Sequence, residues 1–127
     1  MEYTIKEIAK MAGISTRTLR YYDKINLLKP AMVNPSGYRV YSSHEVSLLQ
    51  QVLLYKTLGL PLEAIKQIIY NPTYNYQKAL EVQLKNLHAK KDQIEQLIVN
   101  VEKSLQAIKG EVIMKDEEKF IGLKEKT

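Results

Sequence analysis

The sequence contains a cluster of hydrogen-bond donors but no recognisable combination of catalytic residues. Five donors fall within six consecutive positions: Thr16, Arg17, Thr18, Arg20 and Tyr21. The 127 residues include no cysteine, and the two histidines, His44 and His88, lie far apart in the sequence. Thiolate metal sites and cysteine nucleophiles are therefore excluded, and a histidine cluster is disfavoured. Because paired carboxylates, a phosphate-binding loop and a nucleophile–base set are also lacking, we predict no enzyme, no metal site and no cofactor.

The charge of the chain favours an acidic partner. Lysine and arginine number 19 against 14 acidic residues, which gives a formal net charge of +5. Residues 1–70 carry nine of the basic and five of the acidic residues, and they hold seven of the nine tyrosines. Tyrosine hydroxyls interleaved with basic side chains suit a phosphate backbone. We expect nucleic-acid contacts in this part of the chain, although a merely solvated basic face stays open as an alternative.

Membrane and export signals do not appear in the sequence. No stretch approaches the roughly 18 consecutive apolar residues of a membrane helix, and the N-terminal MEYTIKEIAK carries acidic residues where a signal peptide would carry an apolar run. Hydrophobic residues make up 45% of the chain, which is ordinary for a globular protein. We expect a cytoplasmic protein with one compact domain, an extension, and no membrane partner.

The donors at 16–21 fall on the second of two short predicted helices. Thr4 and Glu7 form a capping box at the start of the first helix, and Gly13 is suited to end it. Ser15 is a typical N-cap for a second helix over residues 16–24. Two helices joined by so short a turn predict a helix-turn-helix unit.

The apolar residues of this unit are spaced to face one another: Ile8, Ala12, Ile14, Leu19 and Tyr22. The donors of the second helix then point outward, where a recognition helix meets base edges.

A β hairpin and two further helices follow in the predicted head. Residues 29–41 read as an extended segment, the turn NPSG and the strand-forming YRVY, which together predict a wing. Ser42 and Glu45 form a second capping box, and Gly59 ends the helix that they begin. Pro61 starts a short helix that Asn71-Pro72 closes. We therefore expect a DNA-binding head over residues 1–72.

The hydrophobic period changes to a coiled-coil heptad in residues 73–110. Positions separated by alternating steps of four and three form a seam: Leu80, Leu84, Leu87, Lys91, Ile94, Ile98, Val101, Leu105 and Ile108. Lys91 is the one polar member, and it reads either as a device that sets register or orientation or as a weak point in the seam. A helix of about 43 Å exposes this seam unless it self-associates, so we predict a homodimer. Folding back onto its own head is the alternative.

With these residues described, the chain resembles the MerR family of bacterial transcription regulators. The likeness covers residues 3 to about 109 and rests on YTIKEIAKMAGIS, TRTLRYYDKINLLKP, SGYRVYS and KTLGLPLEAIKQII. It implies a mainly α fold: a winged helix-turn-helix head with a small β-hairpin wing, followed by a long C-terminal dimerisation helix. The resemblance, not the heptad pattern, implies that the two helices pair as an antiparallel coiled coil.

The resemblance also assigns roles to individual positions. It places base reading on Thr16, Arg17 and Thr18. Thr4 is also expected to bind DNA, and phosphate contacts are expected from Arg20, Tyr21, Tyr22, Tyr38, Arg39, Tyr41 and Lys56. The spacing turns Tyr22 toward the core, so a purely structural Tyr22 is the alternative, as is simple solvation for Arg39 and Lys56. We expect Asp23 to be a structural partner of a nearby Arg or Lys.

By resemblance the protein activates transcription by bending and untwisting a promoter with an overlong spacer, at which RNA polymerase acts. The absence of cysteine disfavours metal- and redox-sensing branches. The tail, residues 111–127, instead resembles the start of the antibiotic-recognition domain of TipA-like and Mta-like regulators. This predicts a truncated portion of a multidrug regulator, whose hydrophobic drug or antibiotic effector would need a missing C-terminal domain. An architectural, excisionase-like DNA-binding protein without effector control is the alternative function.

Overall fold

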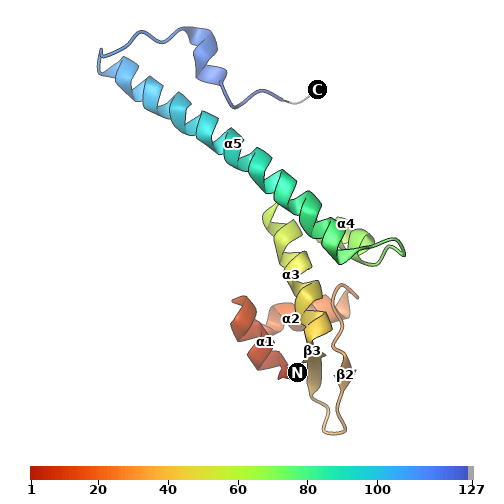
Figure 1. The fold of residues 1–127 in the computed structure, drawn as a ribbon. Coiled ribbons are helices and arrows are strands. Elements are labelled where there is room, and N and C mark those ends of the chain that lie inside the picture. Colours follow the sequence, from red (N-terminus) through yellow and green to blue (C-terminus); the bar gives the residue numbers. More distant parts are fainter. Residues whose placement is uncertain (126–127) are drawn as a thin grey trace. The chain divides into compact units, whose positions relative to one another are not determined.

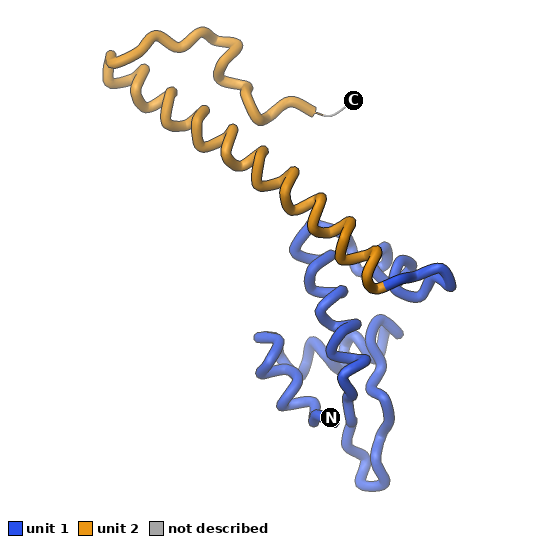
Figure 2. The backbone as a smooth tube through the Cα atoms, in the orientation of Figure 1, with its two compact units in different colours: residues 1–75 blue, residues 76–127 orange. Residues whose placement is uncertain are grey.

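The structure is a computed structural model that describes residues 1–125 (Figure 1). Its elements are β1 (Glu2–Thr4), α1 (Ile5–Ala12), α2 (Thr16–Lys24), β2 (Met32–Val33), β3 (Arg39–Ser42), α3 (Ser43–Thr57), α4 (Leu62–Ile69), α5 (Tyr76–Ile108) and the 3₁₀ helix η1 (Asp116–Phe120). The chain divides into two compact units, Met1–Asn75 and the residues from Tyr76 onward (Figure 2). The predicted mainly helical fold with a small sheet and a long C-terminal helix is confirmed.

The first two helices begin at the predicted capping residues, and the first also ends at its predicted cap. Thr4 and Glu7 form the capping box of α1, with the Glu7 amide 3.1 Å from the Thr4 hydroxyl. Gly13 ends α1 with φ of +70°, the left-handed conformation that glycine adopts without strain. Ser15 accepts a hydrogen bond from the Thr18 amide at the start of α2. Local backbone chemistry thus sets where these helices start and where the turn between them lies.

A three-stranded antiparallel sheet lies beside these helices, in the order β1-β3-β2. Strands β2 and β3 form the predicted wing, with Met32 opposite Val40. Strand β1 is an addition that the sequence analysis missed, and it pairs Tyr3 with Tyr41 on the other edge of β3. The wing is therefore joined to the N-terminus as well as to its own hairpin partner.

Helices α3 and α4 complete the first unit. The Glu45 carboxylate accepts a hydrogen bond from the Ser42 amide at 2.7 Å, which confirms the second capping box. After α3, Gly59 takes a left-handed φ of +92°, and Pro61 occupies the N-cap position of α4. The core of the unit gathers side chains from every helix: Ile8, Ala9, Leu19, Tyr22, Leu27, Leu28, Tyr41, Leu49, Val52, Tyr55, Ile65 and Ile69. This core positions one face of α2 inward and leaves the other for solvent.

The second unit consists of α5, 33 residues long, and the segment that follows it. Gly110, with φ of +78°, turns the chain after α5. Residues 111–125 then run back along α5, and η1 lies against it (Figure 1). The structure thus docks the tail on the helix.

Asn100 is the main polar anchor of this docked tail. Its side-chain amide is buried and donates to the carbonyls of Lys119 and Ile121, each at 2.9 Å. Lys103 pairs with Glu118, whose pKa is lowered by the hydrogen bond from that lysine. These contacts order the backbone of a segment that has few buried apolar side chains of its own.

Candidate DNA-binding surface

The exposed side of α2 presents most of the predicted donors. Arg17, Arg20 and Tyr21 are exposed, and Tyr21 keeps 51% of its surface accessible. On the opposite side Leu19 and Tyr22 are buried, so the helix cannot rotate these donors inward without opening the core. Cationic and phenolic donors on one helical face match the contacts that DNA offers along its grooves and backbone.

The two threonines of the predicted base-reading set are less available than Arg17. Thr16 and Thr18 are half-buried. The Thr18 hydroxyl lies 2.9 Å from the Ser15 hydroxyl, and its amide donates to that same oxygen at 3.0 Å. Thr18 is therefore part of the N-cap of α2, which holds the first turn in place. The strongest exposed donor in this turn is Arg17.

The wing presents a second group of donors next to α2. Asn34 shapes its turn, because the Asn34 side-chain oxygen accepts from the amides of Ser36 and Tyr38 at 3.0 and 2.9 Å. Gly37 supplies the left-handed φ of +85° that the turn requires. This turn leaves Tyr38 70% exposed at the edge of the hairpin.

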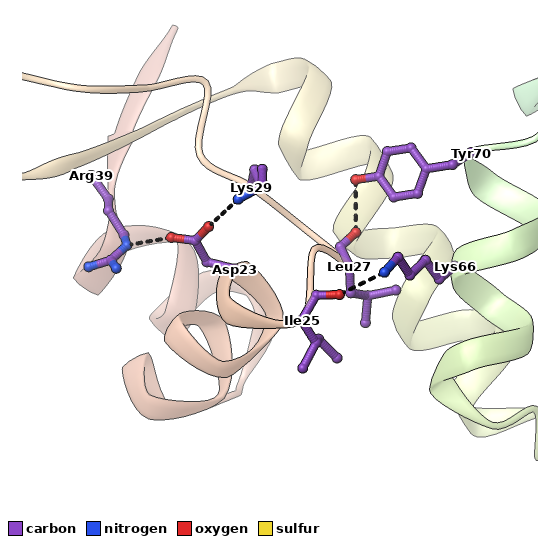
Figure 3. Close-up of polar contacts among 7 residues, drawn as sticks. All are labelled: Asp23, Ile25, Leu27, Lys29, Arg39, Lys66 and Tyr70. Atoms are coloured by element: carbon purple, nitrogen blue, oxygen red, sulfur yellow. Dashed lines mark hydrogen bonds and ion pairs between the residues drawn. The ribbon is translucent and has the colours of Figure 1, made fainter.

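Asp23 joins the wing to α2 through two ion pairs (Figure 3). Its carboxylate accepts from Arg39 Nε at 3.0 Å and from Lys29 Nζ at 3.3 Å. Burial alone would raise the pKa of Asp23, but the hydrogen bonds and positive charges of Arg39 and Lys29 outweigh it and lower that pKa. The expectation that Asp23 is a structural partner of nearby basic residues is confirmed.

Two of the predicted phosphate contacts are not presented to solvent. Tyr22 is 1% exposed and Tyr41 fully buried, and neither hydroxyl has a hydrogen-bond partner within the described part of the chain. Tyr41 points inward because it pairs with Tyr3 in the sheet and packs in the core, and this burial raises the pKa of its hydroxyl. Neither hydroxyl can reach a phosphate in this conformation, and the burial of Tyr22 favours its structural alternative.

Two long-range anchors behind α2 were missed by the sequence analysis. Lys66 of α4 donates to the carbonyl of Ile25 at 3.0 Å, and the Tyr70 hydroxyl donates to the carbonyl of Leu27 at 2.9 Å (Figure 3). Both carbonyls lie just beyond the C-terminal end of α2, where helical hydrogen bonding has stopped. Helix α4 therefore fixes the end of the helix that presents the donors.

The remaining predicted DNA contacts lie at helix ends. Lys56 is exposed in the last turn of α3. Thr4 is exposed, but its hydroxyl already accepts a hydrogen bond from the Glu7 amide as part of the N-cap of α1. Lys56 is free to meet a phosphate as a flexible point charge.

The predicted seam on α5 is open to solvent. Seven apolar members are exposed: Leu84, Leu87, Ile94, Ile98, Val101, Leu105 and Ile108. Leu80 is half-buried, and Lys91 is exposed. An apolar stripe of this length on a single helix is typical of a surface that associates with another protein chain.

Other kinds of site find no support in the described residues. Within residues 1–125, histidine and carboxylate side chains do not gather in threes as a metal site requires. Over the same range, none of the helices combines the length and apolar character needed to cross a membrane.

Comparison with known proteins identifies the family. Residues 4–41 match the family described as MerR family regulatory protein. The transcriptional activator mta of Bacillus subtilis is 35% identical over 123 residues, which cover 97% of this chain and 48% of that protein. The crystal structure of the transcriptional regulator SkgA from Caulobacter crescentus is similar with a TM-score of 0.88 and 34% identity, covering 98% of this chain and 89% of that one. The chain belongs to the MerR family.

Within the MerR family, this chain falls in the branch of Mta and TipA, as predicted. It spans about half the length of the curated relatives that it matches. A third similar structure is HiNmlR, described as a MerR family regulator lacking the sensor domain and bound to promoter DNA, with a TM-score of 0.68 and 25% identity over 87% of this chain and 92% of that one. These relatives are named as transcription regulators, in agreement with the absence of a catalytic set in the sequence.

Proposed function

We propose that this MerR-family chain binds promoter DNA as a homodimer and reads its sequence with α2. The observation that carries the proposal is the arrangement of α2, which is capped by Ser15, buried along Leu19 and exposed at Arg17. Arg17 lies in the first turn, the part of a recognition helix that reaches base edges, and arginine pairs bidentately with guanine. The likeness to HiNmlR, whose structure is described as bound to promoter DNA, supports this assignment.

The backbone contacts that we propose come from both sides of α2. Arg20 and Tyr21 lie on α2 itself, Tyr38 and Arg39 on the wing, and Lys56 at the end of α3. All are exposed or half-buried with donors that suit phosphate oxygens. Thr16 and Thr18 contribute to base reading at the edge of the surface. Thr4, whose hydroxyl already serves its cap, would take part by orienting the N-terminus of α1.

The dimer forms through the seam of α5. Two copies of the chain would bury the exposed apolar stripe against each other and present two heads to two half-sites. The antiparallel direction of the pair follows from the family resemblance. Dimerisation doubles the phosphate contacts, and it raises affinity most for a two-fold related site.

The regulatory action that we propose is activation at a shared promoter. Two heads that grip the backbone on either side of a spacer can bend and untwist it, which aligns an overlong spacer for RNA polymerase. The relative mta is named an activator, which favours activation over repression. Membership of the Mta and TipA branch is what suggests a hydrophobic drug or antibiotic as the effector.

Selection of binding sites from random DNA duplexes, followed by footprinting, tests DNA binding and operator symmetry directly. Arg17→Ala should cost about 1 to 3 kcal/mol on the selected duplex and relax its base preference. Lys56→Ala should weaken binding to the selected and a scrambled duplex alike, and lower the salt slope by about one. Equal losses on both duplexes for Arg17→Ala would show that Arg17 is not a base reader.

Transcription in vitro separates activation from a purely architectural role. A promoter carrying the selected site in a spacer lengthened by about two base pairs should yield more transcript when the protein is added. The same promoter with a spacer of ordinary length serves as the control. DNA binding without any change in transcript level would favour an architectural protein.

A further inference from the structure

We infer that Asp23 is a positioning residue for DNA binding, which fixes the wing against α2 so that the free donors of Arg39 and Lys29 face the DNA backbone. The inference rests on the proposed DNA-binding function and deepens it. Asp23 is the one acidic residue of α2, and it lies on the same helix as the exposed donors Arg17, Arg20 and Tyr21.

The geometry ties together three separate parts of the head. Asp23 belongs to α2, Lys29 to the segment that connects α2 with the wing, and Arg39 to strand β3. One carboxylate oxygen accepts from Arg39 and the other from Lys29, as Figure 3 shows. The Asp23 side chain keeps only 19% of its surface exposed, so water competes little for these oxygens. Each oxygen is thus committed to one cation.

Arg39 retains most of its hydrogen-bonding capacity in this arrangement. A guanidinium has five N–H donors, and Asp23 engages the single donor on Nε. The four donors on the two Nη atoms have no other partner within residues 1–125, and the Arg39 side chain is 33% exposed. A guanidinium held by Nε presents its Nη end in a fixed direction, which is the geometry for bidentate contact with a phosphate. Lys29, with a side chain 60% exposed, is oriented in the same way.

Asp23 has two opposite consequences for DNA binding. Its negative charge lowers the local charge of the cluster from +2 to +1, which weakens attraction to DNA of any sequence. Its hydrogen bonds fix the wing relative to α2, which favours the one register in which base and backbone contacts form together. A residue whose role is positioning must therefore lower nonspecific affinity and raise discrimination.

The variant Asp23→Asn tests this combination. The chain and its variants are titrated by fluorescence anisotropy on the selected duplex and on a scrambled duplex, at several salt concentrations. Affinity for the scrambled duplex should rise about two- to fivefold, because one repelling charge per head is gone. The ratio of selected to scrambled affinity should fall about tenfold, because the wing is no longer oriented. Asp116→Asn, which removes an exposed carboxylate that pairs with Lys119 on the tail, is the charge-matched control and should change neither value.

Asp23→Glu separates orientation from charge, and it keeps the test decisive if Asp23→Asn folds poorly. Glutamate keeps the negative charge but displaces the carboxylate by one methylene. Nonspecific affinity should stay at the wild-type level while discrimination falls about threefold. A double-mutant cycle with Arg39→Gln should show that Asp23→Asn costs little further discrimination once Arg39 is absent.

Distinct outcomes overturn the inference and the proposed function. If the wild-type chain does not distinguish the selected from the scrambled duplex, the proposed function fails. If the wild type discriminates and Asp23→Asn or Asp23→Glu keeps the same ratio, the positioning role of Asp23 is refuted. If Asp23→Asn raises affinity equally for both duplexes, Asp23 only repels DNA through its charge, and the positioning role is likewise refuted.

Discussion

Removing the Tyr70 hydroxyl should destabilise the head through the end of α2. The Tyr70 hydroxyl donates at 2.9 Å to the carbonyl of Leu27, whose side chain lies in the core. In Tyr70→Phe that carbonyl loses its side-chain donor, and the cost of a lost hydrogen bond to a poorly hydrated acceptor is about 1 to 2 kcal/mol. For a domain of this size, each 1 kcal/mol lowers Tm by about 4 to 8 °C. We therefore expect Tm to fall by at least about 4 °C.

Denaturation by heat and by urea, followed by circular dichroism, measures this effect. Tyr38→Phe is the matched control, because Tyr38 is 70% exposed and makes no hydrogen bond through its hydroxyl within residues 1–125, so its Tm should shift by no more than a surface change does. The urea m-value should be the same for both variants, since the folded surface is unchanged. Tyr70→Phe unfolding at the same Tm and urea midpoint as Tyr38→Phe would refute the view that α4 holds the end of α2.

Further predictions address the ion pairs, the seam and the tail. Because its ion pairs lower the folded-state pKa of Asp23, their contribution is present above the ordinary value of 3.8 and lost as the pH falls through the folded pKa. The stability advantage of the wild type over Asp23→Asn should therefore disappear on acidification in a Tm series from about pH 7 to 2.5, and an advantage that persists at the lowest pH would contradict the linkage. Leu87→Asp combined with Ile94→Asp should give a monomer in analytical ultracentrifugation that no longer binds a two-fold site, whereas a persisting dimer would rule out the seam. Asn100→Ala should release the tail, because it removes both hydrogen bonds to the tail carbonyls, and amide hydrogen exchange in residues 111–125 should become faster while α5 stays intact. Gln106→Ala, at an exposed position of the same helix, is the control and should leave this exchange unchanged. Unchanged exchange in Asn100→Ala would show that other contacts hold the tail.

The features that the sequence predicted well are those with local causes. Thr4, Gly13 and Ser15 act on backbone groups within a few positions of themselves, so both ends of α1 and the start of α2 could be read directly. The wing turn follows from residues that are adjacent in the chain. The burial of Leu19 against the exposure of Arg17 follows from helical periodicity alone.

The features that it missed depend on partners distant in the chain. Strand β1 has only three residues, too few for an alternating pattern, and it exists because β3 offers an unpaired edge. The bonds from Lys66 and Tyr70 reach carbonyls about 40 residues away, which no local motif signals. The inward direction of Tyr41 depends on its register opposite Tyr3, and resemblance to a family motif does not report which side of a sheet a residue faces.

The proposed antiparallel direction rests on the family resemblance, and Lys91 adds a physical reason that disfavours the parallel one. A parallel, in-register dimer would place Lys91 directly against its counterpart in the partner, two like charges in the middle of an apolar interface. In an antiparallel coiled coil each a position faces a d position of the partner helix. Lys91 would then lie beside an apolar residue instead of a second lysine, and its stem could pack while its ammonium reached solvent. The tail, which docks on Asn100 and Lys103, occupies a face roughly a third to a half of a turn away from this stripe. Lys91 therefore disfavours only the parallel arrangement. Because the tail and the seam use different faces of α5, the helix can bind its own tail and a partner helix at the same time.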